Sequence, residues 1–227
     1  MNLFKQNIGE SARDYVYRLI RENIISWGLM PGESVTVQRL SDLTNVSRTP
    51  VREALLQLQF EKVIDVFPRK GCFISYLNFE LANNYILVRR VLELTMLEIL
   101  CNNIDETGIA LLENNIKLQK LYAEQKRYHE LFSLDNDFHR LFFQLAGHLD
   151  VVSIYQSFSI HADRIRSLGV HENHQTVVDL LADHQALIDA IKQKDMAQIR
   201  TIITRHICGF SDDLQNKLHS RHPEYFE

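Results

Sequence analysis

The hydrophobic positions of this chain follow a helical period over most of its length, with one interruption that favours β-strands. Apolar residues recur every three or four positions from Ser11 to Trp27, and Gly28 then supplies a stop, which predicts a first helix. Two runs rich in β-branched and aromatic residues, 63–67 and 72–76, interrupt the helical pattern. The N-terminal part is therefore expected to combine helices with a small sheet.

A short second helix is predicted between Thr36 and Asn45. Threonine favours the N-cap of a helix, and asparagine tolerates the left-handed conformation in which many helices end. The apolar positions that we expect to face inward are Val37, Leu40 and Leu43. A third helix follows almost at once, capped by Ser47 or Thr49, with Pro50 in a first turn that needs no N–H. Two short helices joined by a tight turn form the helix-turn-helix pattern.

The two β-rich runs flank residues 68–71, Pro-Arg-Lys-Gly, which predicts a hairpin, or wing, with two cations at its tip. The polar side chains that open the third helix are suited to phosphates and guanine edges: Ser47, Arg48, Thr49 and Arg52. A single exposed arginine is usually just solvated. Arg48 and Arg52 are four residues apart and share a face, and a wing would place Arg69 and Lys70 beside them, which favours a DNA-binding surface.

Three motifs in this region carry a family resemblance. They are Pro31-Gly32-Glu33-Ser34-Val35, the run LSDLTNVSRTPVREAL at 40–55, and Arg69-Lys70-Gly71. Together they resemble the GntR family of bacterial transcription regulators. The resemblance implies that the recognition helix contacts the operator through Ser47, Arg48, Thr49 and Arg52. It also implies that Arg69, Lys70 and Gly71 follow the minor groove or the DNA backbone. Gln38 is a weaker candidate for the same surface.

Beyond Asn78 the helical period continues without a proline until Pro223, and glycine is sparse. This pattern predicts an antiparallel bundle of six or seven helices without strands. The expected helices lie near 79–103, 106–125, 128–146, 149–168, 174–193 and 195–219. The chain is thus predicted to be mostly α, with a winged helix-turn-helix domain at 1–76 and an all-α domain at 77–227.

Polar residues fall on the apolar faces of three of these helices. Asp135 and His139 lie one turn apart in the stripe of one helix, His184 lies on the apolar face of another, and His206 on that of the last. A single inward histidine is usually a hydrogen-bonded core residue. Burying all four groups is costly unless they are paired, and one divalent cation bound by an aspartate and three histidines would remove every one of those costs. Zinc is favoured, while nickel and manganese also suit this ligand set.

A second resemblance rests on Asp135-Asn136-Asp137-Phe138-His139, on the run DHQAL at 183–187 with Ala190-Ile191, and on His206. These segments resemble the FCD sensor domain of the FadR subfamily. The resemblance implies that the metal ligands are Asp135, His139, His184 and His206. It also implies, from Arg90-Val91-Leu92-Glu93, that Arg90 helps to neutralise a carboxylate effector. Arg164 is a further candidate for that counter-charge, with a surface or interdomain salt bridge as its alternative.

Charge is distributed unevenly along the chain, whose net charge is −4. Residues 1–76 hold 10 Lys and Arg against 8 Asp and Glu, a net of +2, whereas residues 77–227 hold 15 against 21, a net of −6. This asymmetry suits a DNA-facing head on an acidic body. The start of the sequence lacks the apolar core of a secretion signal, and no stretch approaches the roughly 18 apolar residues of a membrane helix, so we expect a cytoplasmic location.

With the two resemblances, these patterns lead us to expect a homodimer that binds a palindromic DNA operator and whose operator binding is modulated by a small carboxylate at the metal site. Two alternatives stay open. One is the same regulator with a purely structural metal, and the other is a metal-dependent hydrolase that uses an open coordination position. No general base is identifiable beside the expected ligands, and a hydrolase would leave the N-terminal domain unexplained. We therefore predict that the protein is not an enzyme.

Overall fold

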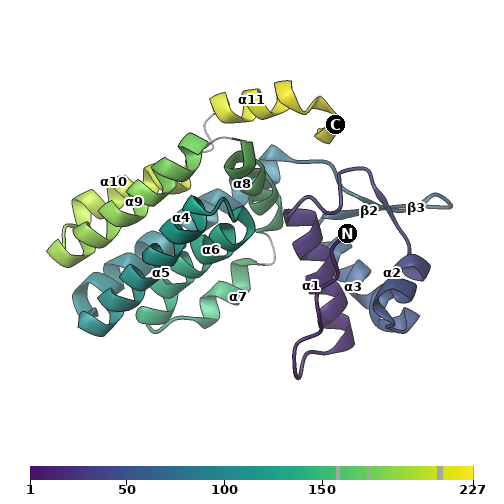
Figure 1. Ribbon diagram of the computed structural model, residues 1–227, viewed down its shortest axis with the longest axis horizontal. Helices are drawn as coiled ribbons and strands as arrows, with labels where there is room; N and C mark the ends of the chain where they lie inside the picture. The colour runs from purple at the N-terminus through teal and green to yellow at the C-terminus, as the bar shows by residue number, and fades with distance from the viewer. Residues whose placement is uncertain (157–158, 173, 209–211, 227) are drawn as a thin grey trace.

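The protein is described by a computed structural model that covers residues 1–156, 159–172, 174–208 and 212–226. Figure 1 shows two parts, a smaller one built from the N-terminal helices and strands and a larger one built from helices. The C-terminal segment returns to the connection between them, where the Leu77 amide donates to the Tyr225 carbonyl at 2.8 Å. Both ends of the larger part therefore lie near the junction.

The N-terminal helices are α1 (Ala12–Ile25), α2 (Val37–Thr44) and α3 (Arg48–Phe60). The boundaries of α2 follow the predicted caps, because the Thr36 side chain accepts a hydrogen bond from the Arg39 amide and Asn45 adopts the left-handed conformation. Ser47 precedes α3 as predicted, but its side chain forms no capping hydrogen bond. Leu43 was expected to face inward, and this was wrong: it is 40% exposed, because Leu40 alone carries the buried contact of this short helix. The helix-turn-helix itself is present as predicted.

A three-stranded antiparallel sheet completes this part, with strands β1 (Ser34–Val35), β2 (Ile64–Phe67) and β3 (Gly71–Ile74) in the order β1-β3-β2. β2 and β3 form the predicted hairpin, in which Phe67 faces Gly71. The turn between them uses left-handed conformations at Arg69 and Gly71. β1 was not predicted, since a strand of two residues has no period of its own and exists through its pairing with β3.

The larger part is helical throughout its described residues apart from the short connections, which confirms the mostly α class. Its helices are α4 (Phe79–Asn103), α5 (Glu106–Glu124), α6 (Tyr128–Leu145), α7 (Asp150–Gln156), α8 (Ile160–Glu172), α9 (His174–Gln193), α10 (Met196–Ile207) and α11 (Asp212–Arg221), followed by a 3₁₀ turn at Pro223–Tyr225. The expected helices 149–168 and 195–219 are each divided in two, so the described part has eight helices here rather than six or seven. None of the helices in the described ranges has the length and apolar content to cross a bilayer.

Helix α8 lies between the two parts, packing on α4 on one side and on α1 on the other (Figure 1). Every residue from Ile160 to Val170 except Arg166 is buried. The first of these, Ile160, belongs to the hydrophobic core that α1 and α3 form with the sheet. The remaining helices surround a second, larger core that includes Phe138, Phe142 and Ile165. α8 is thus positioned to connect the interior of the helical part with the N-terminal part.

Candidate functional site

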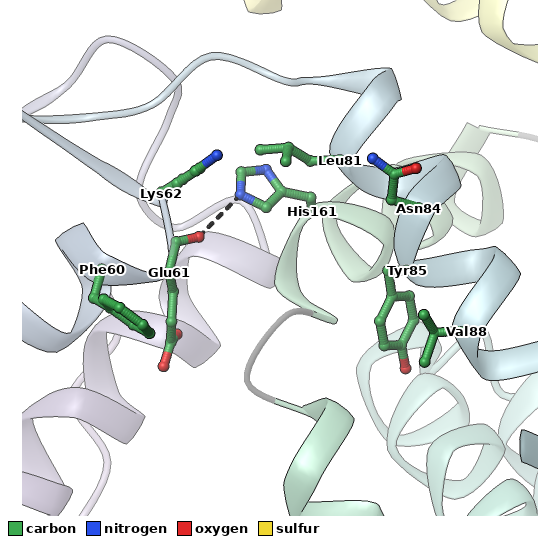
Figure 2. A pocket seen from close by; sticks show the side chains of 8 residues that line it. All are labelled: Phe60, Glu61, Lys62, Leu81, Asn84, Tyr85, Val88 and His161. Carbon is green, nitrogen blue, oxygen red and sulfur yellow. Dashed lines mark hydrogen bonds between the residues drawn. The ribbon is translucent and has the colours of Figure 1, made fainter.

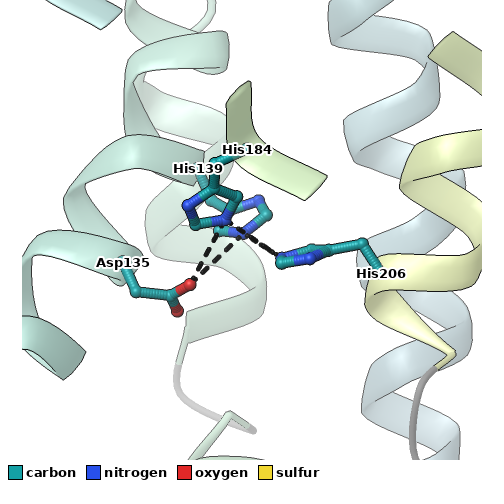
Figure 3. Close-up of side chains that lie close together, drawn as sticks. All are labelled: Asp135, His139, His184 and His206. Atoms are coloured by element: carbon teal, nitrogen blue, oxygen red, sulfur yellow. Dashed lines mark hydrogen bonds and ion pairs between the residues drawn. The ribbon is translucent and has the colours of Figure 1, made fainter. Parts of the chain in front are cut away.

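The structure brings Asp135, His139, His184 and His206 together from three helices (Figure 3). Asp135 and His139 project from α6 one turn apart, His184 from α9 and His206 from α10. Each residue offers one ligand atom, and these atoms all lie within 4.8 Å of one another. Nε2 of His206 lies 3.1 Å from Nε2 of His139 and 3.1 Å from Nε2 of His184. The first three residues are buried, and His206 is partly buried.

Each of the three imidazoles holds its Nδ1 against an oxygen of a neighbouring side chain. The pairs are His139 with Glu93 Oε2 at 2.6 Å, His184 with Gln119 Oε1 at 2.9 Å, and His206 with Asp183 Oδ2 at 3.5 Å. Because carboxylate and amide oxygens accept hydrogen bonds, Nδ1 carries the proton in each neutral ring. The bare Nε2 lone pairs then face one another, an arrangement that repels unless a cation lies between them.

The protonation states of the buried members agree with this arrangement. Burial lowers the pKa values of His139 and His184 well below 6.5, with the nearby Arg89 and His206 acting in the same direction. Burial on its own would raise the pKa of Asp135, but nearby positive charge, above all that of Arg166, outweighs it and lowers that pKa below its usual range. The three buried members are therefore two neutral imidazoles and an ionised carboxylate, which are the protonation states that bind metals.

The two carboxylate oxygens of Asp135 have different surroundings. Oδ2 accepts a hydrogen bond from Arg166 Nη2 on α8. Oδ1 is buried and accepts no hydrogen bond from the described residues, and it lies 3.4 Å from Nε2 of His184 and 3.9 Å from Nε2 of His139. Bonds of about 2.1 Å would place neighbouring ligands of a tetrahedral cation about 3.4 Å apart. The separations of 3.1 to 3.9 Å bracket this value, so the four residues fit a divalent metal ion.

The arginines near the cluster differ from the expectation. Arg89 is the buried one, and its Nε donates to Glu93 Oε1 at 2.6 Å, so that Glu93 bridges Arg89 and His139. Arg90 is partly buried, with Nη1 3.8 Å from the sulfur of Cys208 just after α10. Sequence analysis missed Glu93, although its position four residues after Arg89 is the spacing of an ion pair along one helix.

Arg164 lies at the junction of the two parts rather than in the cluster. Its Nη2 donates to the carbonyl oxygen of Ser75, just after β3, at 2.8 Å. The side chain is fully buried, and burial lowers the pKa of Arg164 to about 10. This is an interdomain position like the one that sequence analysis gave as the alternative.

An ionic chain leads from the cluster to α1. Arg166, which donates to Asp135, also donates from Nη1 to Oδ1 of Asp163 at 3.1 Å. Oδ2 of Asp163 lies 3.0 Å from Nη2 of Arg21 on α1, and Ser159 Oγ is within 2.7 Å of both partners. Asp163 is buried and accepts from both arginines. The candidate metal ligand Asp135 is thus connected to the N-terminal part through three ion pairs, in which Arg166 and Asp163 are the two residues of α8.

The residues expected to contact DNA form an exposed surface. Ser47, Arg48, Thr49 and Arg52 occupy the start of α3 and the residue before it, and all are exposed. Gln38 on α2 accepts a hydrogen bond from Arg48 Nη2, which joins the two helices of the motif. Arg69, Lys70 and Gly71 are exposed at the hairpin turn. The start of α3 and the wing therefore present exposed cations and hydrogen-bonding groups.

A winged helix-turn-helix joined to a helical bundle defines the class of DNA-binding transcription regulators. Residues 12–74 match the bacterial regulatory proteins of the gntR family, and residues 85–208 match the FCD domain. The chain therefore belongs to the GntR family of regulators and carries a C-terminal FCD domain, as the two resemblances implied.

Relatives and solved structures agree with this assignment. An HTH-type transcriptional regulator in an unstable DNA locus of Streptomyces ambofaciens is 31% identical over 97% of this chain and 92% of its own length. The transcriptional repressor RspR of Escherichia coli is 25% identical over 92% of this chain and 91% of its own. The structure of E. coli McbR/YncC shares the fold, with a TM-score of 0.78 and 17% identity over 92% of this chain and 99% of that one. The family consists of regulators, not enzymes, which confirms that prediction and sets the hydrolase aside.

Proposed function

We propose that this regulator binds a divalent metal ion at Asp135, His139, His184 and His206, and that a small carboxylate bound at this site alters the affinity of the N-terminal domain for its operator. The proposal divides the chain into a DNA-binding domain at 1–76 and an FCD domain at 77–227. The observation that carries it is the convergence of three bare imidazole nitrogens and one unsatisfied carboxylate oxygen on one point.

The four residues would hold the cation through Nε2 of each histidine and Oδ1 of Asp135, and their partners would fix the ring orientations. Zinc, nickel and manganese each accept this combination of nitrogen and oxygen ligands. When bound, such a cation supplies a positive charge. A cation that accepts a fifth ligand besides these four side chains also offers a coordination position to a carboxylate oxygen. Arg90 supports effector binding as a counter-charge, because it makes no ion pair with the described residues, whereas Arg89 is held by Glu93.

The ionic chain through α8 supplies a route from this site to the DNA-binding domain. A carboxylate ligand that competes with Asp135 for Arg166 changes the partner of that arginine, and Arg166 shares Asp163 with Arg21 of α1. α1 in turn packs against the recognition helix α3. A coupling free energy of about 1–3 kcal/mol along such a route changes operator affinity 5- to 150-fold.

We propose further that the protein acts as a homodimer on a palindromic operator, with Arg48 and Arg52 reading base edges in the major groove. Leu87 and Val91 form an exposed apolar strip on α4, which directly follows the DNA-binding domain. A twofold contact through this strip would use the same residues of both subunits. Repression is the sign of regulation that we propose, because RspR and the gluconate operon regulator of Bacillus licheniformis are both described as repressors.

Fluorescence anisotropy tests the proposal with zinc-loaded protein and labelled duplexes, including the sequence upstream of its own gene. We expect tight binding to that duplex at low nanomolar concentration and a change of at least fivefold in affinity with one member of a panel of small carboxylates. Equal affinity for every duplex, including random DNA, would contradict the DNA-binding assignment.

A second candidate is the same regulator with a purely structural metal. The number of ligands favours this candidate, since three histidines and one aspartate fill all four coordination positions of a tetrahedral zinc ion. Calorimetry on zinc-loaded and nickel-loaded protein separates the two candidates. Heat of binding from a carboxylate that is lost when the metal is removed supports the sensor, whereas no metal-dependent binding from the whole panel with either metal supports the structural role.

A further inference from the structure

A cleft separates the end of the recognition helix from the first helix of the FCD domain (Figure 2). Its volume is about 260 Å³, and its walls include Phe60 from α3, Leu81, Tyr85 and Val88 from α4, Lys62, and His161 from α8. A second cavity of about 480 Å³ under the wing adjoins it and shares Lys62, Leu81 and His161. Both cavities lie between the domains, away from the Asp and His cluster.

His161 provides a buried hydrogen-bond acceptor in the wall of this cleft. Its Nε2 lies 3.2 Å from the carbonyl oxygen of Glu61, and because a carbonyl can only accept, Nε2 carries the proton. Burial lowers the pKa of His161 to about 4, so the ring is neutral and Nδ1 is left as a bare acceptor. Nδ1 is buried, and no described residue donates a hydrogen bond to it. A buried acceptor without a donor is costly, and a hydroxyl group would satisfy it.

Lys62 provides a cation beside this acceptor. Figure 2 shows its side chain extending toward the His161 ring. It is exposed and forms no ion pair with the described residues. Its backbone is left-handed at φ 59, where the chain leaves α3, and this conformation is shared by Lys126 at φ 55. An anionic group bound in the cleft would be the counter-charge of Lys62.

The rest of the cleft is apolar. Phe60, the last residue of α3, is 76% exposed, and Val88 opposite it on α4 is 46% exposed. Tyr85 lies beside Val88, and Figure 2 shows the two side chains next to each other. A ring or a branched aliphatic group between Phe60 and Val88 would remove apolar surface of both domains from water, which is favourable.

We propose that this cleft is a second small-molecule site, separate from the metal cluster, that takes a hydroxycarboxylate with an apolar, ring-sized body. The carboxylate pairs with Lys62, the hydroxyl donates to Nδ1 of His161, and the body packs between Phe60 and Val88. Because Phe60 ends the recognition helix and Val88 belongs to the FCD domain, the bound molecule contacts both domains at once.

Calorimetry on the metal-loaded full-length chain tests the site with 3-phenyllactate, which has all three features. 3-Phenylpropionate lacks the hydroxyl and 2-phenylethanol lacks the carboxylate. We expect 3-phenyllactate to bind, and each of the other probes to bind roughly tenfold more weakly, since one leaves Nδ1 without a donor and the other leaves Lys62 without an anion. Equal binding of all three probes, or no binding of 3-phenyllactate, would overturn the proposal.

Matched variants locate the binding. Lys62→Gly removes the cation and relieves the left-handed backbone, so we expect unchanged or higher thermal stability with about fivefold weaker 3-phenyllactate binding. Lys126→Gly makes the same backbone change in the connection between α5 and α6, and it should leave binding unchanged. Val88→Trp fills the cleft and should abolish binding, whereas Val178→Trp, equally exposed on α9, should not.

The same variants separate this site from the metal cluster. The proposal requires binding that persists in His184→Ala and is lost in Val88→Trp. Binding that is lost in His184→Ala and persists in Val88→Trp would assign 3-phenyllactate to the metal cluster and overturn the second site.

Discussion

Arg21 and Asp163 join the two domains through an ion pair in which Nη2 and Oδ2 lie 3.0 Å apart. The aspartate is buried and the arginine is partly exposed, so the pair is well shielded on the α8 side. Through Arg166 the same aspartate is one side chain away from the candidate metal ligand Asp135. This geometry makes Asp163 the residue that connects the candidate metal cluster with the N-terminal domain.

We predict that Asp163→Asn uncouples the two domains. The amide keeps the size of the side chain but loses the charge that both arginines share, so the free energy of unfolding should fall by about 2 kcal/mol. The ratio of operator affinities between zinc-loaded and chelator-treated protein should move toward one, with zinc content unchanged. Anisotropy titrations and elemental analysis measure both quantities. Asp189→Asn, at an exposed position on α9, is the control and should keep the affinity ratio of the parent protein. If Asp163→Asn also kept the parent ratio, the coupling would not run through Asp163.

We predict that Arg48→Ala and Arg52→Ala each remove specific operator binding without unfolding the domain. Both side chains are exposed, and a bidentate contact with a guanine contributes about 1–3 kcal/mol, so affinity should fall roughly 10- to 100-fold. Anisotropy measures the affinity, and circular dichroism confirms the fold. Arg200→Ala, exposed on α10 in the FCD domain, should have no effect on affinity. Unchanged affinity in both recognition-helix variants would remove them from the interface.

We predict that His184→Ala lowers bound metal and thermal stability together. Loss of one ligand weakens the site, and metal that binds only the folded chain stabilises it, so both quantities should drop in parallel. Inductively coupled plasma mass spectrometry and calorimetry measure them. His148→Ala, at an exposed position after α6, is the matched control. Full metal content in His184→Ala would exclude this histidine as a ligand.

We predict that His161 makes the protein less stable in acid. Burial, assisted by the charge of Arg164, lowers its pKa from 6.5 to about 4. Between these values the unfolded chain binds the proton and the folded chain does not, so the free energy of unfolding falls with the pH by up to about 1.4 kcal/mol per unit, and above 6.5 the contribution is constant. Denaturant titrations from pH 4 to 7 should show a smaller slope for His161→Phe than for the parent, whereas the exposed His129→Phe should keep the parent slope. Parallel curves for His161→Phe and the parent would exclude His161 as the titrating group.

The sequence predicts the N-terminal domain well because its signals are local. Thr36 caps α2, Asn45 ends it, and the runs around 68–71 form a hairpin, and each of these depends on a few neighbouring residues. The inward positions of Asp135 and His139 could be predicted for the same reason, since the apolar stripe of α6 is continuous and one side of the helix faces the core.

Helix α8 could not be predicted in the same way. It is buried on nearly all sides, so its sequence has no apolar stripe, and its polar residues pair with partners that are distant along the chain. Asp163 pairs with Arg21, and Arg164 binds Ser75. Similarly, α4 packs against α6, α8 and α10, so periodicity does not indicate which of its two adjacent arginines, Arg89 or Arg90, is buried. These assignments require the tertiary contacts themselves.

The inclusion of Ile160 in the core of α1 and α3 has a consequence for dissecting the protein. A fragment that ends at residue 76 would lose Ile160 from this core and expose the surface that α8 covers, and removing such a side chain from a core costs about 2–5 kcal/mol. That loss is comparable to a large share of the stability of a domain this small. The intact chain should accordingly unfold in one cooperative transition. Part of the hydrophobic core of the N-terminal domain comes from α8, a helix more than eighty residues further along the chain.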